Sequence, residues 1–339
     1  MCFLNNPIDK SLSELKIGQF YHFCPHELKQ YVFSNNKCSR AICYNYSKQI
    51  KEDLKNILGI GGKSTNNIAL QPSPIYGPVK SRRLGWSLGI NICPAKYKLC
   101  SFNCVYCQYG WTNVCRLDVS DRLADLTSTE NLYDSLEKLL LASRQIDNFT
   151  FSGNGESTLH PYFDDMVDIV LSLKARYVPD ARVGILSNSS KLSNPSVYSA
   201  LSKLDFRIMK LDAGDSDTFN RINMPCPDVR YDDILDGLKS LDNIIIQTMF
   251  VDGEPSNTGE RQVYRWMERI SEIGPKSVQI YSLHRPPAAS SLIEADSHKL
   301  AGIAERTRAE TGIPVDYVVA SKPYEDRVHQ PWMFNGSKK

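Results

Sequence analysis

Beyond Lys80, short apolar segments alternate with longer amphipathic ones, and this alternation constrains the fold more than any other feature of the chain. Parallel strands need crossover connections, and a sheet buried on both faces needs cover, so the alternation predicts parallel strands with helices outside. Six such units fall short of the eight that close a full barrel, so we expect an α/β fold, a partial (β/α)6 TIM-type barrel. The predicted strands are 87–92, 148–151, 182–186, 206–211, 243–250 and 277–281. The predicted helices are 128–142, 162–175, 196–204, 231–240, 260–273 and 297–311.

The first 72 residues differ in composition from the rest of the chain, because they are polar and rich in Asn, Lys and Ser. They contain one helical pattern, at 47–58, which ends at a run of glycines. A Pro-rich connector follows at 71–78. We therefore expect a small N-terminal extension over 1–72, the partial-barrel core over 73–320 and a C-terminal tail over 321–339.

Composition predicts a globular protein in the cytoplasm. Hydrophobic residues make up 42% of the chain and charged residues 23%, which excludes disorder, collagen-like repeats and a coiled coil. No segment approaches the roughly 18 uninterrupted apolar residues of a membrane span. The N-terminus has polar residues where a signal peptide would be apolar, so no membrane association is expected.

The chain has ten cysteines, and five of them fall between positions 93 and 115. A chain this long, with a normal core and no export signal, has little need of disulfides, so a metal or redox site is the leading interpretation. Cys100, Cys104 and Cys107 have the spacing C-x3-C-x2-C, which can bring three thiolates to one soft metal centre. Structural zinc and simple electron-transfer clusters take four protein ligands, whereas three leave one position open.

The net charge of +2 conceals an asymmetry along the chain. Residues 1–115 carry 14 Lys and Arg against 5 Asp and Glu, and no acidic residue occurs between 72 and 115. This basic surrounding favours an anionic cofactor or substrate near the three cysteines, or else forms a solvated basic face.

Polar residues gather where the predicted strands end, which is where α/β folds carry their chemistry. The loop that holds the three cysteines follows the first strand, and Ser152-Gly-Asn-Gly-Glu156 follows the second. Further strand-end residues are Ser187, Asn188, Asp212, Gly214, Gln247, Thr248, Tyr281, Ser282, His284 and Arg285.

The three-cysteine loop, with Tyr106 before its last cysteine and six βα units around it, resembles the radical S-adenosylmethionine superfamily. The resemblance covers roughly residues 75–334. The segments 75–85, 107–110 and 151–161 are similar to a narrower group of iron-sulfur oxidoreductases related to the wyosine-forming tRNA enzymes. Ser157 and Lys80 stand where that group commonly has Pro, and the 94–100 segment is longer than usual.

The resemblance implies that Cys100, Cys104 and Cys107 ligate a [4Fe-4S] cluster whose fourth iron binds the amino and carboxylate groups of S-adenosylmethionine. It also implies an electron donor such as flavodoxin or ferredoxin, and reductive cleavage of S-adenosylmethionine to a 5′-deoxyadenosyl radical. The cofactor then carries the difficult chemistry, and the protein supplies orientation and exclusion of water.

Further residues match the S-adenosylmethionine site of the family. Asn154, Gly155 and Glu156 match its second motif, which receives the amino group of S-adenosylmethionine, and Tyr106 is expected near the adenine. Ser187 and Asn188 match polar residues that meet the ribose or carboxylate, although these two residues could equally cap a helix. The Gly153–Glu156 segment taken alone reads as a tight turn.

The residues leave three alternatives open. A zinc ion could bind the three cysteines together with Cys93, Cys115 or a histidine. A non-catalytic iron-sulfur or zinc protein, acting as a redox sensor or binding module, is the alternative to an enzyme. A second metal could be held by Cys24, His26, Cys38 and Cys43. The substrate is not fixed by the sequence: RNA, with tRNA base modification as one hypothesis, and a peptide or small metabolite all remain open.

Overall fold

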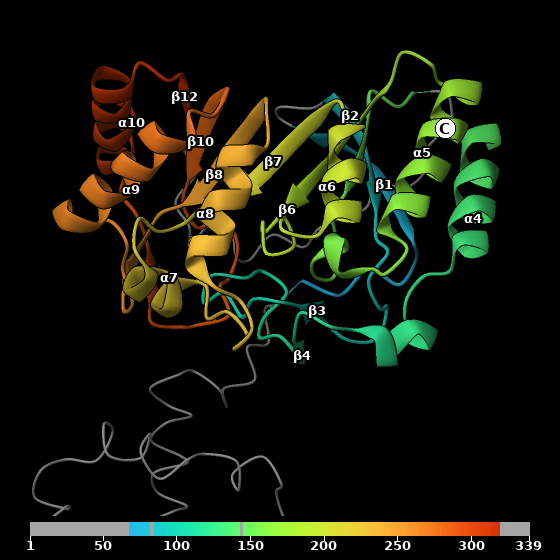
Figure 1. Cartoon of the computed structure of the whole chain (residues 1–339), viewed down its shortest axis with the longest axis horizontal. Coiled ribbons are helices and arrows are strands. Elements are labelled where there is room, and N and C mark those ends of the chain that lie inside the picture. The colour runs from blue at the N-terminus through green and yellow to red at the C-terminus, as the bar shows by residue number, and fades with distance from the viewer. Residues whose placement is uncertain (1–67, 82–84, 143–144, 319–339) are drawn as a thin grey trace, which may run out of the picture. The chain divides into compact units, whose positions relative to one another are not determined.

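An eight-stranded sheet forms the centre of the computed structural model, which describes residues 68–81, 85–142 and 145–318 (Figure 1). The first strand is antiparallel to the second, and every later neighbour in the sheet is parallel. The two end strands do not pair with each other, so the sheet is an open, partial barrel, as predicted. In spatial order the strands are β1 (Ile75–Ser81), β2 (Gly85–Ile90), β5 (Asn148–Phe151), β6 (Arg182–Ser187), β7 (Phe206–Lys210), β8 (Ile244–Met249), β10 (Ser277–Tyr281) and β12 (Val315–Val318).

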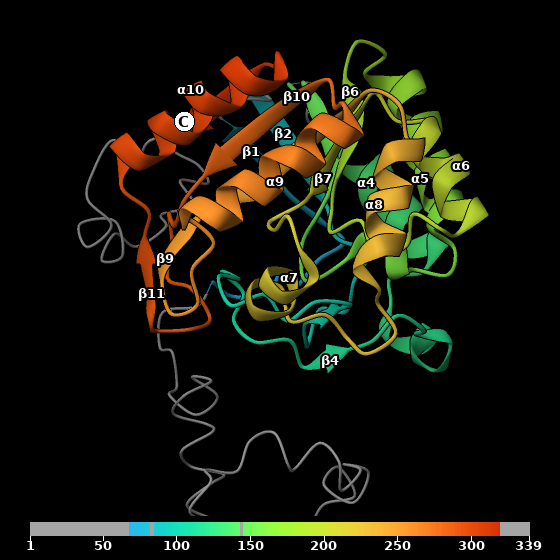
Figure 2. The ribbon, with the colours of Figure 1, turned by 60° about the vertical axis from the view of Figure 1, so that its left-hand side comes forward.

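Helices follow the parallel strands and cover the outer face of the sheet (Figures 1 and 2). Their buried residues recur at helical spacing: α4, for instance, buries Leu132, Leu136 and Leu140 and exposes the opposite face. All six predicted helices are confirmed, with ends shifted by one or two residues. They are α4 (Thr129–Ala142), α5 (Phe163–Tyr177), α6 (Pro195–Ser202), α8 (Tyr231–Ser240), α9 (Glu260–Ile273) and α10 (Ser297–Thr311).

The strands contribute fully buried apolar side chains, such as Ile90, Phe149 and Ile246, to one continuous core. Burial on both faces of the sheet explains why these strands read as short apolar runs rather than as alternating patterns. This is the physical reason why all six predicted strands are found.

Several elements of the fold were not predicted, among them two strands of the main sheet and one helix. The segment expected to be a Pro-rich connector instead contributes β1, in which Pro78 sits at an irregularity of an edge strand, a position where a missing N–H is tolerated. The short apolar run at 313–319 supplies β12, which pairs with β10. A seven-residue helix, α7 (Ser216–Ile222), follows β7 and is too short to show a helical repeat.

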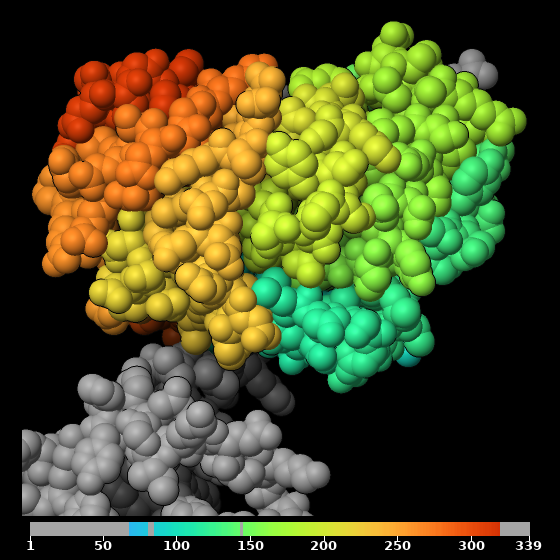
Figure 3. All heavy atoms as spheres, viewed as in Figure 1, coloured from blue at the N-terminus to red at the C-terminus, as the bar shows by residue number. Residues whose placement is uncertain are grey.

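Loops and small elements gather at the carboxyl ends of the parallel strands. The cysteine segment forms a two-stranded pair there, β3 (Leu99–Cys100) and β4 (Val114–Cys115), with the 3-10 helix η1 (Ser120–Asp125) after it. Both views place β4 and α7 beyond the same end of the sheet (Figures 1 and 2). In Figure 3 the teal surface of this segment meets the gold surface of the segment after α7.

Three further small elements belong to the fold. The short strands β9 (Val251–Gly253) and β11 (Leu292–Glu294) pair antiparallel, after β8 and β10 respectively. The 3-10 helix η2 (Ser157–Leu159) follows β5.

Most of the predicted N-terminal extension and C-terminal tail lie outside the described residues. The same holds for the helix expected at 47–58 and for Cys24, His26, Cys38 and Cys43. Within the described ranges, no helix is both long and apolar enough to cross a membrane.

Candidate active site

The first cysteine is positioned by the loop after β5. Leu99, next to Cys100, forms a parallel bridge with Gly155: its N–H donates to Asn154 O (3.3 Å), and its carbonyl accepts from Glu156 N (3.1 Å). A Cβ on Gly155 would lie 1.6 Å from the Leu99 carbonyl oxygen, so only glycine allows this approach. The Asn-Gly-Glu motif therefore builds the backbone on which the first cysteine stands.

The other two cysteines lie in a turn that is held against the segment after α7. Cys107 N donates to Cys104 O at 3.1 Å, which closes the turn. On the far side, Val105 N donates to Ile222 O at 3.0 Å, and Phe102 forms an antiparallel bridge with Pro225. The sequence-distant α7 segment thus fixes the position of the cysteine loop.

Two of the three cysteines have a side-chain amide against the sulfur, and the third has a lysine nearby. Asn188 Nδ2 lies 3.6 Å from Cys100 Sγ, and Asn223 Nδ2 lies 3.5 Å from Cys104 Sγ. The third thiol, Cys107, is near enough to the Lys98 ammonium to raise the pKa of that lysine. The two asparagines come from the end of β6 and the end of α7, and the lysine comes from the loop itself.

Burial dominates the electrostatics of the free thiols. It raises the pKa of Cys100 to about 12 and that of Cys104 to about 11. Lys98 acts in the opposite direction on both, because a nearby positive charge favours the thiolate. Binding of a metal centre would deprotonate these thiols.

Lys98 is a buried cation, only 3% exposed, in the middle of the cysteine loop. Its Nζ donates to Gly110 O at 2.9 Å, and its own N–H donates to Asn113 Oδ1 at 3.0 Å. Burial acts to lower its pKa, but Cys107, Cys100 and Cys104 together raise it further, and the net shift is upward. Lys98 is therefore a buried cation in the same loop as the three cysteines.

Glu156 is fully enclosed by protein donors. One carboxylate oxygen accepts from Thr158 N (3.0 Å), Thr158 Oγ1 (2.7 Å) and Ser187 Oγ (2.9 Å), and the other accepts from Asn188 N (2.7 Å). Burial raises its pKa, against these hydrogen bonds, which lower it. Its side chain links the end of β5 to the end of β6.

Asn154 is equally enclosed. Its Oδ1 accepts from Gln71 N (2.7 Å), and its Nδ2 donates to Gln71 O (2.9 Å) and Pro94 O (2.9 Å). Its backbone N–H donates to Asn91 Oδ1 at 3.0 Å. The side chain thus fastens the segment before β1 to the start of the cysteine loop.

Ser187 and Asn188 lie at the end of β6, beside the cysteine loop, as the sequence predicted. Besides Cys100, Asn188 Nδ2 donates to Ser101 Oγ at 2.8 Å. The following helix, α6, is instead capped by Asn194, whose Oδ1 accepts from Ser196 N and Val197 N. The two strand-end residues therefore contact the motif and the cysteine loop and do not cap this helix.

Tyr106, predicted near the adenine, meets a buried carboxylate. Its hydroxyl donates to Asp212 Oδ2, and Asn223 Nδ2 donates to the same oxygen at 2.8 Å. The other oxygen of Asp212 accepts from Met249 N (2.8 Å) and pairs with Lys210 Nζ (2.9 Å). Asp212, noted in the sequence only as a strand-end residue, is thus the centre of a network next to the cysteines.

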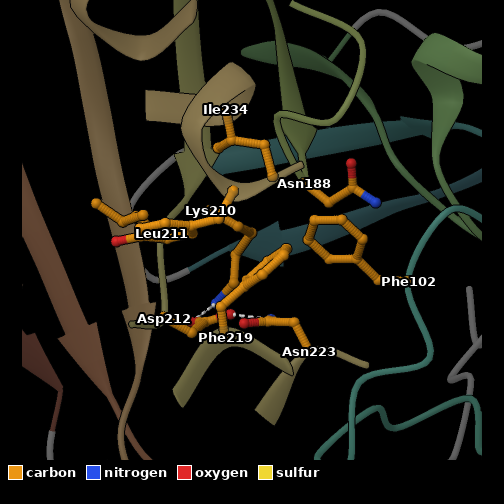
Figure 4. Close-up of a pocket in the computed structure, with 9 residues that line it drawn as sticks. Phe102, Asn188, Lys210, Leu211, Asp212, Phe219, Asn223 and Ile234 are labelled. Carbon is orange, nitrogen blue, oxygen red and sulfur yellow. Dashed lines mark hydrogen bonds and ion pairs between the residues drawn. The ribbon is translucent and has the colours of Figure 1, made fainter. Parts of the chain in front are cut away.

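A small pocket opens on this network (Figure 4). Lys210, Asp212 and Asn223 meet on one side, with Asn188 and Phe102 on another. Lys210 Nζ also lies about 5 Å from the ring centres of Tyr106 and Tyr281. The full lining is Phe102, Asn188, Lys210, Leu211, Asp212, Phe219, Asn223, Tyr231 and Ile234.

Sequence reasoning missed the roles of Lys98, Lys210 and Asn223. Lys98 was counted among the residues of a basic surrounding, and only the fold shows that it is buried. The signal for Lys210 was its place at the end of β7, two residues before Asp212. Asn223 had no signal beyond lying just past that strand.

The remaining cysteines near the loop have their own surroundings. Cys93 is buried, and Cys115 lies beside Cys100 in the β3/β4 ladder. Cys226 is buried as well, and its N–H donates to Ser101 O at 2.9 Å. The described residues contain no group of three or more His, Cys, Asp or Glu side chains placed to hold a metal ion.

The donor set nevertheless fits a cluster that is ligated by thiolates. Three free thiols lie in one loop, and two of them are met by an amide N–H able to hydrogen-bond a negatively charged sulfur, with the Lys98 ammonium buried in the same loop. Hydrogen bonds to the sulfurs are a normal feature of iron-sulfur sites in proteins. The residues present therefore suit a [4Fe-4S] cluster.

Comparison with known proteins adds two curated relatives. The chain is 34% identical over 194 residues to a protein named GTPase Obg from Brachyspira hyodysenteriae, covering 57% of this chain and 26% of that protein. It is 33% identical over 222 residues to the UPF0026 protein MJ1312 of Methanocaldococcus jannaschii, covering 63% of this chain and 64% of that protein. The chain thus spans less than two thirds of the length of each.

Among solved structures, Streptococcus suis SuiB bound to S-adenosylmethionine shares the fold, with a TM-score of 0.50 and 14% identity over 87% of this chain and 60% of SuiB. TYW1 with a lysine-pyruvate adduct bound has a TM-score of 0.48 and 14% identity, over 86% of this chain and 94% of TYW1. The family model of the radical SAM superfamily matches residues 96–277, from the start of the cysteine loop to the first residue of β10. The chain belongs to the radical SAM superfamily.

Proposed function

We propose that the chain holds a [4Fe-4S] cluster on Cys100, Cys104 and Cys107 and reductively cleaves S-adenosylmethionine there. The observation that carries the proposal is the loop itself, with three thiols in the family spacing, an amide donor on two of the sulfurs and a buried lysine in the same loop. When bound, the cluster would supply one electron to the sulfonium, which releases methionine and a 5′-deoxyadenosyl radical. The electron would come from a partner such as flavodoxin or ferredoxin.

The residues of the chain hold the reacting groups in place. The bridge between Leu99 and Gly155 fixes the first ligand, and the contact of Val105 with Ile222 fixes the turn that carries the other two. Glu156 and Asn154 already have protein partners for their side chains, so we assign them to positioning the loop.

We further propose that S-adenosylmethionine lies along the strand ends beside this loop. The residues that border it in this proposal are Tyr106, Asn154, Gly155, Glu156, Ser187 and Asn188. Five of these six are buried or half-buried at the ends of β5 and β6, together with the first cysteine of the loop.

The test is anaerobic reconstitution with iron and sulfide, followed by dithionite and S-adenosylmethionine. We expect about four iron and four sulfide per chain and accumulation of 5′-deoxyadenosine, measured by liquid chromatography and mass spectrometry. Alanine at any one of Cys100, Cys104 or Cys107 should abolish the product. Cys115→Ser is the matched control, because this cysteine neighbours the loop without belonging to the motif, and it should retain iron and product.

Two results would overturn this function. One is undiminished 5′-deoxyadenosine from the triple alanine variant. The other is one zinc per chain, with no iron, after purification and reconstitution without oxygen.

For the substrate, we propose RNA. The support is the basic first third of the chain, with 14 Lys and Arg against 5 Asp and Glu, and the resemblance to enzymes that modify tRNA. Lys98 is buried and contributes nothing to a surface patch, whereas Lys80 and Lys96 are exposed.

Salt dependence tests this proposal. Binding of transfer RNA, followed by fluorescence anisotropy, should weaken at least about tenfold between 50 and 200 mM salt if several phosphates are contacted. Lys96→Glu should weaken it further, and a peptide of matched length should not compete. Absent binding, or binding that salt does not change, would contradict an RNA substrate and leave a peptide or small metabolite.

A further inference from the structure

We propose that Lys98 is a fixed cation that balances the negative charge of the cluster and raises its reduction potential. The inference rests on the proposed function, because it needs a cluster on the three cysteines. It concerns a residue outside the cysteine motif, two positions before its first member.

Protein contacts within the loop fix the side chain of Lys98, which is hardly exposed to solvent. Its side chain leaves the backbone just before β3 and runs inward, with 3% of the residue exposed. Nζ donates to Gly110 O at 2.9 Å, three residues past Cys107. The side chain therefore crosses from the start of the cysteine loop, where its backbone lies, to the end of the loop.

A buried lysine is costly unless its charge is compensated, and lysine is among the residues least often found fully buried. Among the described residues Lys98 takes part in no salt bridge, and the ionisable groups that act on its charge are the three cysteines. A single neutral carbonyl compensates an ammonium poorly. Thiolates on a cluster would provide the missing negative charge.

The other two donors differ from Lys98 in kind. Asn188 and Asn223 present neutral amides to Cys100 and Cys104, at 3.6 and 3.5 Å. A full positive charge acts on nearby sulfurs more strongly and over a longer range than a neutral amide does. The cluster potential depends on net charge and on hydrogen bonds to the sulfurs, so Lys98 should be the strongest of the three influences.

The direction of the effect follows from electrostatics. Three thiolates on a 2+ core leave a net negative charge, and reduction adds one more electron. A fixed positive charge in a low-dielectric surrounding stabilises the reduced form more than the oxidised form. Loss of the charge should therefore make the cluster harder to reduce.

The experiment measures the potential of the reconstituted full-length chain without S-adenosylmethionine, by redox titration with the electron paramagnetic resonance signal of the reduced cluster as readout. Lys98→Met keeps the length of the side chain and removes the charge, whereas Lys98→Arg keeps the charge. Lys96→Met is the matched control, because it removes an exposed lysine from the same loop.

We expect the ratio of reduced to oxidised cluster in Lys98→Met to fall at least about tenfold at a fixed potential, which is a shift of 59 mV for one electron. Lys98→Arg and Lys96→Met should stay within about threefold of the wild-type ratio. A ratio in Lys98→Met within about threefold of wild type overturns the inference. An equal fall in Lys98→Arg also overturns it, because the charge would then not be the cause.

Lys98→Gln covers the case in which Lys98→Met fails to hold a cluster, since its amide can still donate to Gly110 O. Iron lost from both neutral variants but kept by Lys98→Arg supports charge balance by Lys98. Iron lost from all three variants assigns the residue to folding of the loop and overturns the inference. A wild-type chain without iron overturns the proposed function, and this inference with it.

Discussion

Gly155 and Leu99 approach so closely that a Cβ on the glycine would lie 1.6 Å from the leucine carbonyl oxygen. The contact joins the loop after β5 to the strand that carries the first cysteine. Because the obstacle is backbone, no side-chain rotation can relieve it.

Gly155→Ala should therefore disturb the cysteine loop directly. We expect a loss of more than about 2 kcal/mol in the free energy of unfolding, as for an overpacked core, together with loss of bound iron. Urea unfolding and iron analysis measure the two effects.

Gly302→Ala provides the matched control for this substitution. Gly302 lies on α10 with nothing within 4 Å of an added Cβ, so alanine should stabilise by about 0.4–1 kcal/mol and leave iron unchanged. Equal stability of Gly155→Ala and wild type would show that the observed approach is not maintained in solution.

Glu156→Ala should weaken the connection between β5 and β6. Removing the carboxylate leaves the Asn188 N–H and the Ser187 and Thr158 hydroxyls without their acceptor in a buried site. The expected cost is about 2–4 kcal/mol, since several donors are affected. Chemical denaturation measures it, and Glu305→Ala, an exposed change on α10, should shift stability by less than about 0.5 kcal/mol.

Lys210→Met should destabilise the fold far more than loss of an exposed ion pair. Lys210 and Asp212 pair at 2.9 Å, with side chains 15% and 0% exposed. Removing one partner leaves an uncompensated buried charge, which should lower the free energy of unfolding by about 3–5 kcal/mol. Lys203→Met, from an exposed pair with Asp168, should cost less than about 1 kcal/mol.

The double variant Lys210→Met with Asp212→Asn completes the cycle for this pair. It should recover part of the loss, because no uncompensated charge then remains. Additive losses in unfolding experiments would mean that the two charges do not interact.

His160 should make stability depend on pH in the mildly acidic range. Burial lowers its pKa in the folded state, and its ring bonds Thr127 O (2.9 Å) and accepts from Tyr162 N (3.1 Å), which requires the neutral form. The unfolded chain binds a proton near pH 6.5, so stability should be constant above that value and fall as the pH drops below it.

The difference between wild type and His160→Gln isolates this contribution. The pH dependence between about 6.5 and 5 should be weaker in the variant, as measured by thermal unfolding. His298→Gln removes an exposed histidine and should leave the wild-type profile intact. A wild-type profile in His160→Gln would assign the dependence to other groups.

The strands and helices of the core were predictable because burial imposes a pattern on local sequence. Strands such as Ile244–Met249 carry apolar residues on both faces, and helices such as α9 bury Val263, Trp266, Met267 and Ile270 at helical spacing. Edge strand β1 escaped prediction because its proline and glycine read as a connector, and its pairing with β2 is not encoded locally.

For the site, the sequence by itself determined the three cysteines and their neighbours at the strand ends, because ligand spacing and strand-end position are local properties of a chain. Only the tertiary structure decided what surrounds each sulfur. Asn188 reaches Cys100 across 88 positions, and Asn223 reaches Cys104 across 119. In the sequence Lys98 is one basic residue among several, and only the fold shows that it is buried. Which side chains are buried, and which residues distant in the sequence come into contact, depend on how the whole sheet packs against the loop. No local sequence pattern shows either.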